Sequence, residues 1–235
     1  MSNKQKTIGL LGGMSWESTA TYYRELNEGI KAQLGGLHSA KICLVSVDFA
    51  EIERLQHVED WDGTAVILSE AALAIEKGGA DFLLICTNTM HKVAPQIEKN
   101  ISIPILHIAD ATAERLREDG IKKVGLLGTR FTMEQDFYKG RLTEKYGIDV
   151  IVPEEAEREG VHAIIYNELC LGTIDENSRI RYLKIIEQLA ANGAEAVILG
   201  CTEIALLVQQ NHTATPLYDT TAIHAEQAVR QALSN

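Results

Sequence analysis

The sequence KTIGLLG at residues 6–12 returns in the second half of the chain as KKVGLLG at residues 122–128. Two further pairs of segments match in the same order and at nearly the same spacing: GADFLLICT at residues 79–87 with GAEAVILGC at residues 193–201, and PILH at residues 104–107 with PLYD at residues 216–219. Three ordered matches indicate an internal duplication, which constrains the fold more than any single motif does. The sequence therefore predicts two halves with one common plan.

Each repeated segment is a short run of leucine and β-branched residues that is bounded by glycine or proline. Such runs are typical of parallel strands that are buried on both faces. Apolar residues at helical spacing predict helices in the intervening stretches: residues 16–34, 62–77, 111–117, 133–146, 177–192 and 222–233. Strands that alternate with helices predict an α/β fold with a doubly wound parallel sheet in each half.

The helix predicted at residues 222–233 follows the last repeated strand. By the repeat it corresponds to the helix at residues 111–117, where the chain leaves the first half. We therefore expect the C-terminal segment to return to the first half. The predicted domains are residues 1–110 with residues 214–235, and residues 111–213.

The composition is that of an ordinary globular protein, with 46% hydrophobic and 23% charged residues. A formal net charge of −11, without a basic stripe, argues against nucleic-acid binding. The four cysteines lack CxxC spacing and the seven histidines lack HExxH spacing, so we expect neither disulfides nor a metal site. The apolar run at residues 8–11 is too short for a signal peptide or a membrane helix, which predicts a cytoplasmic protein without membrane contact.

Ligands of open parallel sheets bind beyond the carboxyl ends of the strands. The predicted strand ends carry GGMS at residues 12–15, TNT at 87–89, GTRFT at 128–132 and CTE at 201–203. Glycine lets the backbone approach a ligand closely, and threonine and asparagine side chains donate to a carboxylate, so the pattern predicts a small anionic substrate. GLLGGMS lacks both the GxGxxG spacing of a dinucleotide site and the GK[ST] ending of a P-loop. A glycine turn that only packs a helix on a strand is the alternative.

Cys201 ends a predicted strand and should lie near a helix N-terminus, where the dipole lowers the pKa of a thiol from about 8.5. Such a thiol can exchange a proton near neutral pH, whereas the usual free cysteine is buried and inert. The repeat places Thr87 opposite Cys201, so an approximate two-fold axis would aim both side chains at one point. Racemisation without a cofactor requires this geometry, because one group must remove a proton from Cα and another must deliver one to the opposite face.

The segments GGM, CTNT, GT and GCTE at these strand ends resemble the aspartate/glutamate racemase family, and the resemblance covers essentially the whole chain. It implies two pseudo-symmetric doubly wound parallel-sheet domains with the active site between them. It also implies a homodimer that racemises a small-molecule amino acid with no cofactor, neither pyridoxal phosphate nor metal. The same superfamily includes hydantoin racemases, maleate isomerases and arylmalonate decarboxylases.

The family pattern has one catalytic cysteine in each half. The residues that match it here are Asn88, Thr89, Cys201, Thr202 and Glu203. Thr87 stands where the first cysteine is expected, and an alcohol is a poor base that can still donate or relay a proton. Cys86 should point to the other face of its strand, so it is not assigned the missing role.

A second departure concerns the substrate side chain. Aspartate racemases carry a lysine in the motif Ile-Tyr-x-x-x-Lys, whereas here Ile165-Tyr166 is followed at that spacing by Cys170. The candidate substitutes for this cation are Arg54, Lys92, Arg130 and Lys139, and ordinary surface charge is the alternative for each.

The departures resemble those of a branch of L-aspartate/glutamate-specific racemases from enteric bacteria. This resemblance implies that Cys201 acts on one face and Thr87 on the other, with preferential use of the L-enantiomer. The expected substrate-binding residues are Met14, Ser15, Asn88, Thr89, Thr129, Thr132, Tyr166, Thr202 and Glu203.

Two other functions remain open from the sequence. A decarboxylase of the same superfamily reprotonates one face and needs one cysteine, and an amino-acid-binding protein needs no catalytic group. His91 lies four positions after Thr87 and could tune the site or cap a loop. For His224 a carboxylate partner near the pocket, a helix-capping role and a core role are all open.

Overall fold

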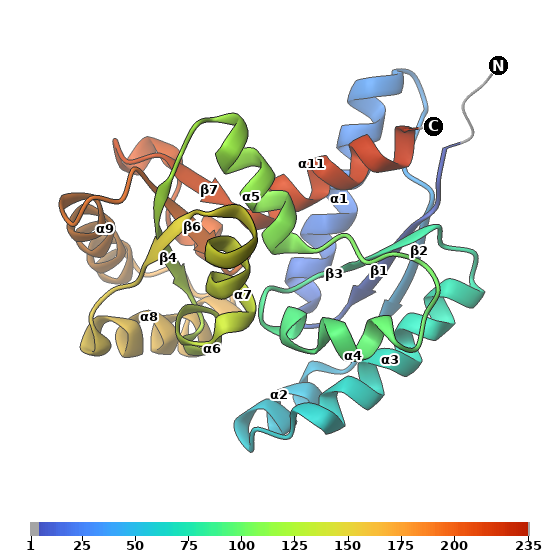
Figure 1. The fold of residues 1–235 in the computed structure, drawn as a ribbon, viewed down its shortest axis with the longest axis horizontal. Coiled ribbons are helices and arrows are strands. Elements are labelled where there is room, and N and C mark those ends of the chain that lie inside the picture. Colours follow the sequence, from blue (N-terminus) through green and yellow to red (C-terminus); the bar gives the residue numbers. More distant parts are fainter. Residues whose placement is uncertain (1–4, 235) are drawn as a thin grey trace. The chain divides into compact units, whose positions relative to one another are not determined.

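The computed structural model describes residues 5–234 and divides into two compact units (Figure 1). One unit holds the chain up to Ile108 and again from His224 onward, and the other holds Ala109–Ile223. Residues 1–4 and 235, which the predicted domain limits include, lie outside the described residues. Within residues 5–234, no helix combines the length and the apolar character needed to span a membrane.

The first unit contains a parallel sheet of three strands in the order β2-β1-β3. These strands are β1 (Ile8–Gly12), β2 (Ile42–Ser46) and β3 (Phe82–Ile85). A parallel bridge between Leu83 and Ile105 adds the beginning of a fourth strand beside β3. β2 and β3 lie on opposite sides of β1 and both pair with it in parallel. The order in which strands are added to the sheet therefore changes direction between β1 and β3, and ligands of such sheets bind at this point.

Side chains of β1 and β3 alternate between two hydrophobic clusters, as the period of a strand requires. Leu11 and Leu83 belong to the cluster formed with α2 (Phe49–His57), α3 (Trp61–Lys77) and α4 (Ala94–Glu98). Leu10 and Leu84 belong to the cluster formed with α1 (Trp16–Leu34) and α11 (Thr220–Leu233). Helices therefore cover both faces of the sheet, and the C-terminal helix α11 packs in the first unit (Figure 1).

The second unit contains a parallel sheet of four strands in the order β5-β4-β6-β7. The strands are β4 (Lys123–Gly128), β5 (Asp149–Ile151), β6 (Ala196–Gly200) and β7 (Leu217–Asp219). Its helices are α5 (Ile108–Glu118), α6 (Arg130–Glu134), α7 (Asp136–Gly140), the π-helix η2 (Arg141–Lys145), α8 (Glu155–Asn167), α9 (Glu176–Ala191) and α10 (Ile204–Leu207). Short 3₁₀ helices occur in both units: η1 (Thr89–Val93) in the first, and η3 (Leu169–Leu171) and η4 (Gln210–His212) in the second.

Polar contacts fix the helices of the second unit to one another. The Tyr138 hydroxyl of α7 donates to Thr112 of α5 at 3.3 Å. Arg141 of η2 donates through two guanidinium nitrogens to Asp110 of α5, which also accepts from Lys145. The two cations hold the pKa of Asp110 below its usual value against the opposing effect of burial. On the other helices, Tyr182 of α9 donates to a backbone carbonyl of α8.

The two sheets confirm the duplication that the sequence predicts, because β4 and β6 occupy the places of β1 and β3. The glycine inside each repeated GLLG segment has the same function in both. A Cβ on Gly9 would lie 2.6 Å from Ile75 Cγ2, and one on Gly125 would lie 2.9 Å from Leu189 Cδ1. A side chain at either position would therefore push away the helix that covers the strand.

Three features differ from the sequence prediction. β2 and β5 are edge strands outside the repeated segments, and their side chains are only partly buried, so the buried-strand pattern missed them. The single helix predicted over residues 133–146 is wrong: Thr129 caps α6 earlier, and Gln135 is extended between α6 and α7. The chain returns to the first unit after Ile223 rather than at residue 214, because β7 pairs with β6.

Candidate active site

The first strand-end turn follows β1 at Gly13 and Met14. Gly13 has φ 93°, and a Cβ there would lie 2.2 Å from the Val47 carbonyl oxygen, so only glycine fits. Its N–H donates to Thr19 Oγ1 at 2.8 Å, and that hydroxyl donates to the carbonyl of Ser15 at 2.9 Å. Ser15 is the N-cap of α1 and accepts from the Ser18 amide. Met14 and Ser15, both predicted to bind substrate, are thus buried in a turn whose backbone is fixed.

The second strand-end turn of this unit follows β3 and begins at Cys86. The Cys86 amide donates to the Leu11 carbonyl of β1, and its own carbonyl accepts from Ser18 at 2.9 Å. The Cys86 side chain belongs to the cluster under α1, and burial raises the pKa of its thiol. The prediction that Cys86 points away from the strand-end positions is therefore confirmed, whereas Thr87 is half-buried.

Asn88 and Thr89 are buried at the start of η1, directly after Thr87. His91 lies one turn further and is 1% exposed. Its Nδ1 is 2.8 Å from the carbonyl oxygen of Thr87, and its Nε2 accepts from the Ile108 amide at 3.2 Å. The imidazole therefore holds the backbone of the Thr87 turn.

A cluster of three buried histidines lies beneath this turn. The centres of the His107 and His224 rings lie 4.5 Å and 5.9 Å from the centre of the His91 ring, and all three side chains are buried. His224 accepts from the Tyr22 hydroxyl at 2.7 Å and donates through Nε2 to the Leu106 carbonyl at 2.8 Å. Burial lowers the pKa of His224 to about 4, so the ring is neutral. His224 therefore has the core role. Neither His107 nor Tyr22 could be identified from the sequence, because their partners come from distant segments.

In the second unit, β4 and β6 end side by side with Gly128 paired to Gly200. Thr129 follows Gly128 and caps α6, and its hydroxyl lies 3.2 Å from that of Thr132. Both threonines are buried. Cys201 follows Gly200, so the register of the two strands brings Thr129 and Cys201 to neighbouring strand ends.

The Cys201 thiol donates to the Glu203 carboxylate at 2.9 Å. Glu203 is 6% exposed and Cys201 is half-buried. Burial, followed by the negative charge of Glu203, raises the pKa of the Cys201 thiol well above its usual value. The prediction that a helix dipole lowers this pKa is therefore wrong. The helix that follows, α10, has only four residues, and its effect is smaller than that of the buried carboxylate.

Thr202 is fixed from the side of β7. The Thr221 hydroxyl donates to Thr202 Oγ1 at 3.1 Å, and the Thr221 amide donates to Asp219 at 2.9 Å. Thr220 donates to the Leu199 carbonyl of β6. The hydroxyl of Thr202 is thus held by residues that the sequence motif does not include.

Tyr166 and Cys170 come from the segment at the end of α8. The Tyr166 ring packs on that of His162 at 4.8 Å. Cys170 lies in η3, which contacts α10, and its charge contributes to the raised pKa of Cys201. Glu168 Oε2 is buried and makes no hydrogen bond among the described residues. The segment that carries a lysine in aspartate racemases therefore presents acidic groups here.

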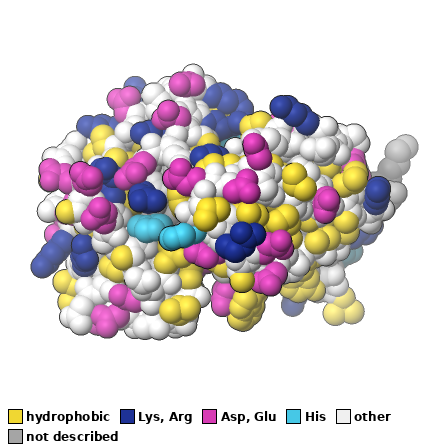
Figure 2. Space-filling model, turned by 90° about the horizontal axis from the view of Figure 1, so that it is seen from below, with side chains coloured by type: hydrophobic (Ala, Val, Ile, Leu, Met, Phe, Trp, Pro, Cys, Tyr) yellow, Lys and Arg dark blue, Asp and Glu magenta, His cyan; other side chains and the backbone are white. Residues whose placement is uncertain are grey.

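The four candidate cations lie in different surroundings. The Lys92 ammonium lies 3.9 Å from the centre of the Trp61 ring, and burial lowers its pKa. Lys139 lies 3.8 Å from Asp136, whereas Arg54 is exposed. Arg130 is also exposed and lies over the Phe131 ring. On the face that Figure 2 presents, basic and acidic side chains are interspersed without a continuous basic stripe.

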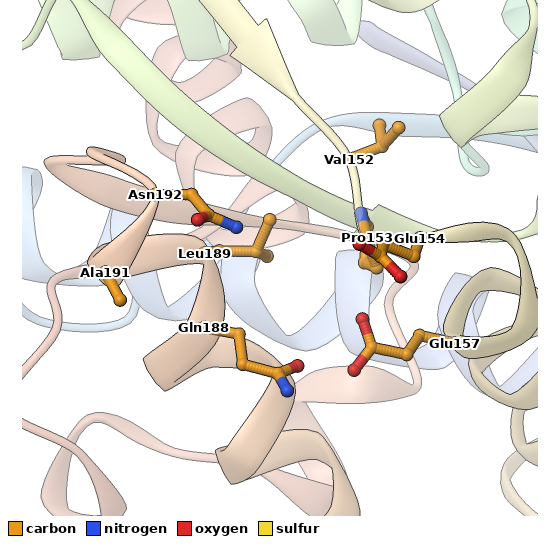
Figure 3. A pocket seen from close by; sticks show the side chains of 8 residues that line it. All are labelled: Val152, Pro153, Glu154, Glu157, Gln188, Leu189, Ala191 and Asn192. Atoms are coloured by element: carbon orange, nitrogen blue, oxygen red, sulfur yellow. The ribbon is translucent and has the colours of Figure 1, made fainter.

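A pocket of about 260 Å³ lies in the second unit and contains none of the predicted site residues (Figure 3). Its lining consists of Val152, Pro153, Glu154, Glu157, Gln188, Leu189, Ala191 and Asn192. Glu157 and Gln188 point toward one another across it, and Gln188 to Asn192 come from the end of α9. The predicted site residues lie at the strand ends instead, so we assign no chemistry to this pocket. Among residues 5–234, no group of three or more metal-binding side chains could hold a metal ion.

Comparisons with known proteins place these strand ends in context. Residues 11–228 match the family described as Asp/Glu/Hydantoin racemase. The broad specificity amino-acid racemase RacX of Bacillus subtilis is 22% identical over 97% of this chain and 98% of its own length.

Two solved structures are similar over nearly the whole chain. A candidate Asp/Glu racemase from Yersinia pestis is 58% identical, with a TM-score of 0.92 over 97% of this chain and 100% of that one. PH1733 of Pyrococcus horikoshii, an aspartate racemase homologue, is 34% identical, with a TM-score of 0.85 over 97% of this chain and 100% of that one.

Proposed function

Because the chain belongs to the Asp/Glu/hydantoin racemase family and is an amino-acid racemase, we propose that it inverts Cα of acidic amino acids, L-aspartate or L-glutamate, with Cys201 and Thr87 as the acid/base pair. The observation that carries this proposal is the hydrogen bond from the Cys201 thiol to the buried Glu203 carboxylate. A cysteine with a proton acceptor in contact can become a thiolate although its own pKa is raised.

The proposed reaction begins at Cys201. Glu203 accepts the thiol proton, and the resulting thiolate removes the Cα proton from one face of the substrate. Thr87 then donates its hydroxyl proton to the opposite face and recovers a proton from water. Glu203 returns its proton to solvent, so each cycle removes one Cα proton and adds one. The proposal requires Cys201 and Thr87 to reach the same Cα from opposite sides.

The carbanion that forms at Cα is stabilised when donors hold the α-carboxylate. We assign this role to the buried Thr129, Thr132, Asn88 and Thr89, together with Thr202. The fixed orientation of their side chains supports it, since Thr129 contacts Thr132 and Thr221 holds Thr202. We place Met14, Ser15 and Tyr166 along the walls of the substrate site.

The distal group of the substrate needs a binding partner of its own. The segment of Glu168 and Cys170 carries acidic groups where aspartate racemases have lysine, so a distal carboxylate needs a cation from elsewhere. RacX of Bacillus subtilis is described as having broad specificity. We therefore include neutral and basic amino acids beside aspartate and glutamate in the test below.

A preference for the L-enantiomer has a defined meaning for a racemase. The two enantiomers have equal free energies, so kcat/KM must be the same in both directions. When the two acid/base groups are of different chemical types, kcat can differ between the two directions, and KM then differs by the same factor. This is because each direction depends on a different group as the base. We propose that the faster kcat belongs to the L-substrate.

The test is incubation of the purified protein in D2O with each enantiomer of aspartate, of glutamate, of a neutral amino acid such as alanine and of a basic one such as lysine. Loss of the Cα proton is followed by NMR, and the product is examined by chiral analysis. We expect deuterium at Cα together with inversion. Exchange without inversion would reduce the mechanism to one face, and no exchange with any amino acid would contradict the proposal.

One observation favours a second candidate. Of the two cysteines that directly follow strands, Cys86 and Cys201, Cys86 is buried in the core, so Cys201 is the one left for chemistry. One cysteine suffices for a decarboxylase that reprotonates one face of a malonate-type substrate. Release of carbon dioxide from such a substrate, without Cα exchange of amino acids, would favour it. A homodimer, the absence of a cofactor and a cytoplasmic location stay predictions.

A further inference from the structure

We propose that His91 is a positioning residue, which holds the Thr87 turn so that the Thr87 hydroxyl meets Cα. This inference rests on the proposed function of Thr87. The Thr87 carbonyl oxygen lies 2.8 Å from His91 Nδ1, and the Ile108 amide lies 3.2 Å from Nε2. Both ring nitrogens are therefore engaged by backbone groups.

The two contacts determine the protonation of the ring. A backbone amide only donates, so Nε2 is an acceptor and carries no proton. A backbone carbonyl only accepts, so Nδ1 carries the proton and donates it to Thr87. The imidazole is thus neutral, in one tautomer, and joins the Thr87 turn to the first residue of α5.

The equivalent turn in the second unit is built without such a side chain. The Cys201 carbonyl accepts from the backbone amide of Ile204 at 3.1 Å. At the position that the repeat aligns with His91, the second unit has Ala205. The Thr87 carbonyl is therefore held by a side chain, whereas the Cys201 carbonyl is held by a backbone amide.

The surroundings of His91 keep its ring in place. His107 and His224 pack against it within 4.5 and 5.9 Å, and all three rings are buried. His224 is itself fixed by Tyr22 and the Leu106 carbonyl. Rotation of the Thr87 peptide would require the loss of the part-buried hydrogen bond between its carbonyl and His91, so the direction of the Thr87 side chain is set by a rigid support.

Two substitutions separate the contacts of His91. In His91→Asn the side-chain amide takes the place of Nδ1 and can still donate to the Thr87 carbonyl. In His91→Gln the side-chain amide takes the place of Nε2, and the hydrogen bond to the Thr87 carbonyl is lost. The matched control is His224→Gln, which removes a neighbouring buried histidine and can still donate to Leu106.

Two rates are measured in D2O: the rate of deuterium exchange at Cα without inversion, and the rate of inversion. The measured quantity is the first rate divided by the second. It is measured with the enantiomer whose Cα proton exchanges in Thr87→Ala, because that enantiomer presents its proton to Cys201. The ratio is taken within one preparation, so a loss of folded protein cancels. A displaced Thr87 slows only inversion, so we expect His91→Gln to raise the ratio about tenfold or more. His91→Asn and His224→Gln should leave it within about threefold of the wild type.

Three results would overturn the inference. Equal loss of exchange and inversion in His91→Gln would mean that His91 only supports the fold. A ratio in His91→Asn as high as in His91→Gln would mean that the bond to Thr87 is not the determinant. No exchange by the wild-type protein would refute the proposed function itself, and the role of His91 would fall with it.

Discussion

The two strand-end turns at Thr87 and at Cys201 have the same place in the two sheets but different support. At Cys201 the thiol side chain itself is held, by the carboxylate of Glu203. At Thr87 the backbone is held, by the neutral imidazole of His91. The repeat aligns Thr89 with Glu203, so the first unit has no carboxylate at the position from which Glu203 accepts the hydrogen bond of the thiol. The two turns therefore share a backbone plan but differ in the polar groups around the residue at the strand end.

This comparison explains why a threonine and a cysteine can work as a pair. A thiol beside a carboxylate can lose its proton, whereas a hydroxyl of high pKa is a poor base and a weak acid that can still donate or relay a proton when it is well placed. What the hydroxyl lacks in acidity must come from placement, and His91 supplies a fixed backbone. Each variant below removes or exchanges one of these differences.

Removal of the thiol should have the largest effect. We expect Cys201→Ala to lower kcat for racemisation by about 10⁴-fold, because no other group replaces the base on that face. The circular dichroism spectrum and the thermal midpoint should stay near wild type, since the side chain is half-buried. Cys43→Ala, which removes another half-buried thiol away from the strand ends, is the control, and retained activity in Cys201→Ala would refute the role of Cys201.

Removal of the carboxylate comes next. Glu203→Gln keeps the shape of the side chain but loses the proton acceptor, so we expect kcat to fall by about 10²-fold. The charge of Glu203 raises the pKa of Cys201, so its removal should lower that pKa. The alkaline rise of the pH–rate profile should therefore move to lower pH. An unshifted profile would show that Glu203 does not act on the thiol.

The histidine cluster gives the Thr87 side a pH dependence of its own. Burial lowers the pKa of His224 from 6.5 to about 4, so the unfolded chain binds the proton more readily than the folded protein. Stability from this group is complete above pH 6.5 and is lost as the pH falls toward 4, by up to about 3 kcal/mol. Urea unfolding at both ends of this range should show the loss in the wild type. His224→Gln should make the curve flatter, and equal slopes would contradict the assignment.

An exchange of the hydroxyl for a thiol should reduce the asymmetry. In Thr87→Cys both turns carry a thiol, so the kcat values for the two enantiomers should approach each other by about tenfold. The ratio of kcat/KM between enantiomers should remain one in both proteins, which serves as the internal control. An unchanged difference in kcat would locate the asymmetry elsewhere, for example in product release.

Much of this comparison could be predicted from the sequence. The repeated GLLG predicts β1 and β4, and the repeated segment at residues 79–87 and 193–201 predicts β3 and β6. The strand-end positions of Thr87 and Cys201 follow from the same repeat. The edge strands β2 and β5 could not be predicted in this way, because half-exposed strands lack a continuous run of buried residues.

The support of the site could not be predicted in the same way. The raised pKa of Cys201 depends on the return of the Glu203 side chain toward its own turn, which is a matter of rotamer and burial. The histidine cluster joins η1, the segment before α5 and α11, which lie far apart in the chain. His91 was visible as a residue four positions from Thr87, but its acceptor and donor partners emerge only from the fold.

The central claim is that Cys201 and Thr87 each serve one face of Cα. The most direct measurement is Cα exchange in D2O by Thr87→Ala with each enantiomer separately. The account predicts that one enantiomer gains deuterium without inversion while the other stays protonated. Continued inversion of both enantiomers at the wild-type rate would contradict it.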